Sequence, residues 1–134
     1  MRYDPDFPLD KEQWSDLDES EQIDLVVDYH RRTGETLPNL EVHASLHVIV
    51  ENQVLMNDET PIAAALGRLI NDGLDRHDAI HAIASVLSKT MFDAMNSKPD
   101  DDISARYFRE VAELTVAKWR AEAQASTDGK PRIS

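Results

Sequence analysis

Apolar residues along most of the chain recur at intervals of three and four, which is the spacing of an amphipathic α-helix. One inward-facing stripe of this kind consists of Ile23, Val26, Val27 and His30. Long period-two alternation is missing from the sequence, and the β-branched residues form no bounded runs, so no strand is predicted. The pattern of hydrophobic and polar positions therefore predicts an all-α protein.

Capping residues divide this pattern into separate helices. A short helix is expected after Asp10, and a longer one after Asp18, whose carboxylate has capping-box spacing to Glu21. Further helices are expected at about residues 40–57, 61–72, 76–96 and 102–124. We predict an all-α bundle built around four main helices, with a short extra N-terminal helix. It forms one domain at residues 1–125 before a frayed polar tail at 126–134.

Composition and charge exclude several classes of protein. The 134 residues include 26 acidic and 14 basic side chains, a net charge of −12, so a nucleic-acid partner is not expected. The sequence has no run of 18 apolar residues, and no membrane span is predicted. Cysteine is absent, which rules out disulfides and thiolate metal sites. The acidic N-terminus has no apolar signal core, and we expect a cytoplasmic protein.

Four of the five histidines occur as two pairs with helical i, i+4 spacing. His43 and His47 lie in "HASLH", and His77 and His81 lie in "HDAIH". Residues at this spacing share one face of a helix, with Cβ atoms about 6 Å apart, so two imidazoles can reach one ion. Two such pairs are well above the number that five randomly placed histidines would give. The spacing favours a metal site over isolated surface or core histidines.

The predicted helix lengths bring the two pairs together. From His47 the helix at 40–57 runs about 15 Å to its end, and the helix at 61–72 returns by about 17 Å, at 1.5 Å per residue. Short connections favour antiparallel neighbours. The helix at 76–96 should then run parallel to the helix at 40–57 and place His77 and His81 beside His43 and His47.

We therefore predict one divalent transition-metal ion held by His43, His47, His77 and His81. Imidazole ligands make zinc the first choice, with nickel, iron and copper as alternatives. Glu51 extends the first stripe by one more turn, where it could ligate the ion, orient an imidazole or act as a catalytic general base. The sequence leaves open whether Glu51 or His30 joins the site.

The segments "HASLHVIVENQ" and "GLDRHDAIHAI" resemble an uncharacterised family of small bacterial helical proteins, a domain of unknown function that shares an HxxxH…HxxxH pattern. The resemblance covers approximately residues 38–96, and the matching positions are His43, His47, Gln53, His77 and His81. It implies no known activity.

Three functions remain open at this stage. The ion could hold the helices together in a structural or metal-sensing protein, or it could serve a metal-dependent hydrolase or lyase in which Glu51 takes a proton from bound water. The third is a metal-free helical interaction module that binds a partner or itself through Trp119 or the Tyr107–Phe108 pair. A homodimer in which each subunit donates one histidine pair is also compatible with the sequence.

Overall fold

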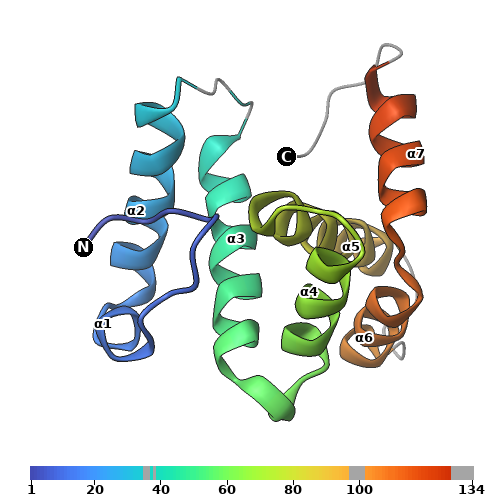
Figure 1. Ribbon diagram of the computed structural model, residues 1–134, viewed down its shortest axis with the longest axis horizontal. Helices are drawn as coiled ribbons and strands as arrows, with labels where there is room; N and C mark the ends of the chain where they lie inside the picture. The colour runs from blue at the N-terminus through green and yellow to red at the C-terminus, as the bar shows by residue number, and fades with distance from the viewer. Residues whose placement is uncertain (35–36, 38, 97–101, 128–134) are drawn as a thin grey trace.

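The computed structural model describes residues 1–34, 37, 39–96 and 102–127, with side chains described as far as residue 122. Within that part of the chain, all regular secondary structure is helical, which confirms the predicted fold class (Figure 1). The helices are α1 (Lys11–Ser15), α2 (Glu19–Arg32), α3 (Leu40–Leu55), α4 (Ile62–Asn71), α5 (Arg76–Met95), α6 (Ile103–Glu113) and α7 (Val116–Thr127), with a 3-10 turn at Asn57–Glu59. Most of the predicted tail at 126–134 lies outside the described residues.

The predicted helix ends are confirmed by their backbone geometry. Asp10 accepts a hydrogen bond from a backbone N–H in the first turn of α1. Asp18 and Glu21 form the reciprocal capping box at the start of α2, with contacts of 2.8 and 3.2 Å. Gly34 and Gly73 follow α2 and α4 with φ of 76° and 119°, a left-handed backbone that glycine adopts without a side-chain clash. These short-range signals fix where the helices begin and end.

The helix expected at 102–124 is divided into α6 and α7, so this prediction is wrong in its continuity. Leu114 has an extended backbone, with φ of −68° and ψ of 133°, and Thr115 then caps α7 through its hydroxyl. Arg68 on α4 donates hydrogen bonds to the carbonyl oxygens of Leu114 and Val111, at 2.8 and 3.2 Å. Arg68 thus adds hydrogen-bond donors at the end of α6, and these donors come from a distant part of the chain.

Helix α3 lies between two hydrophobic clusters. The larger one includes Leu46 and Val50 of α3 and is completed by side chains from α4 to α7. The smaller one contains Ala44 and Val48 of α3, packed against α1, α2 and the N-terminal residues. Burial on both sides explains why α3 carries an apolar run rather than a single apolar stripe.

Helix α5 begins beside α3 and runs away from it at a steep angle, rather than parallel to it as the helix lengths suggested (Figure 1). The N-terminal end of α5, which carries the second histidine pair, is the end that lies next to α3. The two pairs still come together, because both histidines of α5 lie in its first two turns, beside α3. Among the described helices, none is both long enough and apolar enough to cross a bilayer.

Candidate metal centre

All five histidines of the chain gather in one cluster, where α2, α3 and α5 meet. The rings of His43 and His47 on α3 lie 4.6 Å apart between centroids, and those of His77 and His81 on α5 lie 4.1 Å apart. His30 on α2 completes the group, with its centroid 5.2 Å from that of His47. Four of these rings are buried, and His77 is half-buried. The i, i+4 pairs thus face a common centre.

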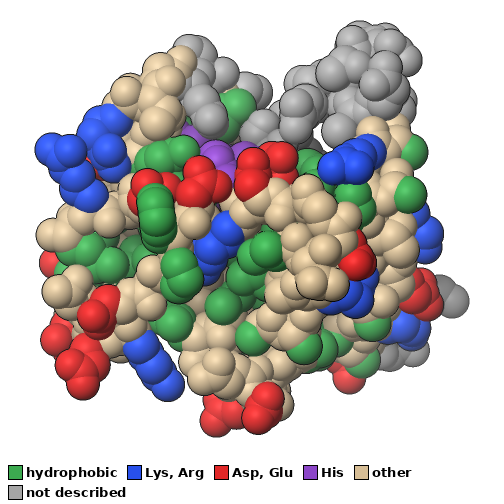
Figure 2. Space-filling view, in the orientation of Figure 1, with side chains coloured by type: hydrophobic (Ala, Val, Ile, Leu, Met, Phe, Trp, Pro, Cys, Tyr) green, Lys and Arg blue, Asp and Glu red, His purple; other side chains and the backbone are tan. Residues whose placement is uncertain are grey.

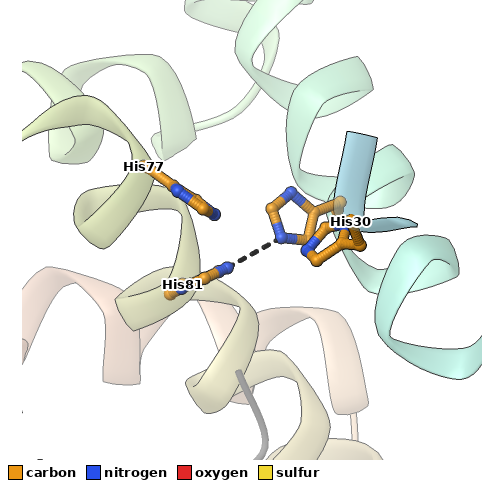
Figure 3. A group of neighbouring side chains, drawn as sticks. His30, His77 and His81 are labelled. Carbon is orange, nitrogen blue, oxygen red and sulfur yellow. Dashed lines mark hydrogen bonds between the residues drawn. The ribbon is translucent and has the colours of Figure 1, made fainter. Parts of the chain in front are cut away.

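Four of the histidines offer nitrogen atoms that all lie within 4.8 Å of one another. They are His30, His47, His77 and His81. Figure 3 shows the rings of His77 and His81 projecting from α5 toward His30, with a dashed line for the 2.9 Å contact between His81 and His47. Ligand nitrogens at 2.0–2.1 Å from a tetrahedral zinc ion are about 3.3 Å apart. The four rings would therefore have to move closer together to coordinate one ion.

The group of four nitrogens includes His30 in place of His43, which was one of the expected ligands. The Nε2 atom of His43 lies 2.9 Å from the Nε2 atom of His30, beside the group of four nitrogens. His30 takes part in that group directly. The signal for His30 was present in the sequence, because this residue ends the inward stripe of α2, but the packing of α2 onto α3 was needed to use it.

Hydrogen bonds fix which nitrogen of His30 faces the centre. Its Nδ1 atom lies 2.8 Å from the backbone oxygen of Val26, one turn earlier on α2. A carbonyl oxygen can only accept a hydrogen bond, so Nδ1 carries the proton and donates it. In the neutral ring the lone pair is then on Nε2, which is the atom that lies next to His43.

Glu51 lies in a buried polar network one turn beyond His47. Its carboxylate forms a two-pronged ion pair with Arg76, at 2.9 and 2.7 Å, and also accepts a 2.7 Å hydrogen bond from the hydroxyl of Tyr3. The Tyr3 hydroxyl is in turn 3.0 Å from Nδ1 of His47. Glu51, Tyr3 and His47 have no exposed surface. The network connects a candidate ligand to a fixed negative charge.

The environment of this network changes three pKa values. Burial and then the charge of Glu51 raise the pKa of Tyr3 well above its usual value, so the phenol stays protonated. Burial by itself lowers the pKa of Arg76, but the hydrogen bond and the charge of Glu51 outweigh it and raise the pKa. Burial, followed by the neighbouring histidines, lowers the pKa of His47 well below 6.5. His47 is consequently neutral at pH 7, the form that binds metals.

The cluster reaches the surface on one side. Histidine side chains are visible between Asp and Glu side chains in the space-filling view (Figure 2). His77 is the half-buried member, and its backbone N–H donates to the Asp6 carboxylate at 3.3 Å. A negative rim of this kind attracts cations to the opening.

The residues considered for a metal-free interaction surface lie in the core. Trp119 and Tyr107 are only 7% and 3% exposed, and Phe108 packs against the same cluster. The Tyr107 hydroxyl donates to the side-chain oxygen of Gln53 at 2.7 Å. These aromatic side chains belong to the larger hydrophobic cluster, and the Tyr107 hydroxyl joins α6 to α3.

The fold and the histidine cluster define a helical protein with a candidate metal centre. Comparison with known families gives a match to Domain of unknown function (DUF1841) over residues 11–113, and the chain belongs to this family. The resemblance to an uncharacterised family is thereby confirmed. No curated protein and no solved structure matches the chain.

Proposed function

We propose that this protein binds one divalent transition-metal ion through its histidine cluster. The observation that carries the proposal is the group of four histidine nitrogens within 4.8 Å of one another. Three of the four side chains, His47, His77 and His81, also belong to the set expected from sequence. We propose His30 as the fourth ligand and His43 as the residue that contacts it.

Zinc is the metal that we propose first. Zinc binds imidazole nitrogens, and structural zinc sites are almost always tetrahedral with four ligands. Four is also the number of histidines in the group. Nickel, iron and copper also bind imidazole and remain alternatives. The lack of a carboxylate in the group of four disfavours magnesium and calcium, which require oxygen ligands.

The contacts of Glu51 support a binding role for the ion more than hydrolysis. As a general base Glu51 would have to accept a proton from metal-bound water. Its two oxygens already accept three hydrogen bonds, two from Arg76 and one from Tyr3. We therefore propose that Glu51 orients the site.

The proposal is tested by elemental analysis of protein purified without an affinity tag. We expect about one transition-metal ion per chain, and X-ray absorption spectra with nitrogen ligands at about 2.0–2.1 Å. A His47→Phe variant, which keeps a flat ring at the centre of the cluster, should lose the ion. Protein that holds no metal, and whose melting changes neither with chelator nor with added zinc, would overturn the proposal.

A further inference from the structure

We propose that Tyr3 is a positioning residue for the metal centre, which holds His47 with its proton on Nδ1 and its lone pair on Nε2. This inference rests on the proposed function, because it assigns a task to Tyr3 at that same site. It extends the site to the first residues of the chain, which precede the region matched by the family at 11–113.

The direction of the hydrogen bonds follows from the groups that take part. The Glu51 carboxylate, ion-paired with Arg76, can only accept. The single proton of the Tyr3 hydroxyl is therefore donated to Glu51, over 2.7 Å. The Tyr3 oxygen is then left to accept from Nδ1 of His47, over 3.0 Å. With its proton on Nδ1, neutral His47 presents a lone pair on Nε2, the atom that lies 2.9 Å from Nε2 of His81.

The N-terminal segment that carries Tyr3 is fastened to the helices of the site. Arg32 on α2 donates to the backbone oxygen of Tyr3 at 3.2 Å, and Arg76 on α5 donates to that of Pro5 at 3.0 Å. The Tyr3 ring packs between Trp14 and Tyr29, with centroid distances of 6.0 and 5.9 Å. Tyr3 is 0% exposed. Its hydroxyl is therefore held at a defined place.

The arrangement is the one by which proteins orient metal-binding histidines. The nitrogen that does not bind the metal donates to a carboxylate or another acceptor, which fixes the tautomer and makes the ring a better ligand. Here the acceptor is a tyrosine oxygen that is itself bonded to a carboxylate. His30 obtains the same orientation from the backbone oxygen of Val26. His30 and His47 therefore both have an unprotonated Nε2, although the acceptor at Nδ1 is a backbone oxygen in one case and a tyrosine oxygen in the other.

The test compares Tyr3→Phe with Tyr107→Phe. Each variant removes one buried hydroxyl and keeps the ring, but the Tyr107 hydroxyl is bonded to Gln53, outside the histidine network. Zinc affinity is measured by competition with a chromophoric chelator. We expect Tyr3→Phe to weaken binding by about 10- to 100-fold and Tyr107→Phe to leave it unchanged. Equal affinities of Tyr3→Phe and wild type would overturn the inference.

A second measurement uses the wild-type protein and separates this inference from the proposed function. Nitrogen-15 chemical shifts of the metal-free protein report which nitrogen of His47 carries the proton. We expect the proton on Nδ1 in wild type and a mixture of tautomers in Tyr3→Phe. A wild-type ring protonated on Nε2 would overturn the role of Tyr3, whatever the protein binds. A wild type that takes up no zinc but has the Nδ1 proton would overturn the metal site and leave the role of Tyr3 in orienting His47.

Discussion

The Nε2 atoms of His47 on α3 and His81 on α5 lie 2.9 Å apart, although 34 residues separate them in the chain. Two nitrogen lone pairs cannot face each other at this distance, so one proton or one cation must lie between them. With His47 protonated on Nδ1, as we propose, the proton in this contact belongs to His81 in the metal-free protein. A metal ion would take the place of the proton and bind both nitrogens.

We propose His30, rather than His43, as the fourth ligand of the ion. His30→Phe and His43→Phe each replace a buried imidazole with a flat ring that has no nitrogen. Because His30 belongs to the group of four nitrogens, we expect its loss to lower zinc affinity by about 100-fold or more, and the loss of His43 by about tenfold. Chelator competition measures both. The reverse order would make His43 the ligand, as the sequence suggested.

Binding of zinc should raise the stability of the fold. The ion would join α2, α3 and α5, which are separate in sequence. The unfolded chain does not hold these histidines together, so the ion should bind the folded protein more tightly. At free zinc 100 times the dissociation constant, we expect the free energy of unfolding to rise by about 2.7 kcal/mol. Urea denaturation with zinc and with chelator measures this difference. Magnesium serves as the control, and an equal gain with magnesium would contradict a histidine site.

Without metal, the protein should lose stability as the pH falls below about 6.5. Because the pKa of His47 is lowered in the folded state, the unfolded chain binds a proton at a pH where the folded protein does not. Protonation then favours unfolding, by up to about 1.4 kcal/mol for each pH unit between the two pKa values. Urea denaturation in chelator at pH 7.5 and 5.5 measures the change, and His47→Phe should reduce it. Equal or greater stability at pH 5.5 would contradict the lowered pKa.

Removing only one partner of the Arg76–Glu51 ion pair should lower the free energy of unfolding strongly. Arg76→Met leaves the Glu51 carboxylate buried beside a neutral side chain, and we expect a loss of about 3–5 kcal/mol. Arg106→Met is the matched control, because the pair of Arg106 with Asp93 is about one-third exposed at both side chains. Its loss should cost less than about 1 kcal/mol. Denaturation curves measure the loss in free energy of unfolding for both variants. Similar losses would contradict the expectation that the buried pair contributes more to stability than the exposed one.

Much of the fold could be predicted because the signals are local. Asp10, Asp18 and Gly34 act within one turn of the helix that they cap, so their roles can be read from neighbouring residues. The break at Leu114 was missed because part of what stabilises it, the side chain of Arg68, comes from 46 residues away. The only local sign of the break is Thr115, a residue type that can cap the helix after it.

The amino-acid sequence alone determined that the chain is helical, where most helices begin and end, and that two histidine pairs share helix faces. Only the tertiary structure decided that α5 leads away from α3 at a steep angle, that His30 joins the group, and that Tyr3 and Arg76 donate hydrogen bonds to the Glu51 carboxylate. Caps and periodicity act over a few residues, whereas the direction of a buried side chain depends on every element packed against it. The candidate metal centre depends on such packing.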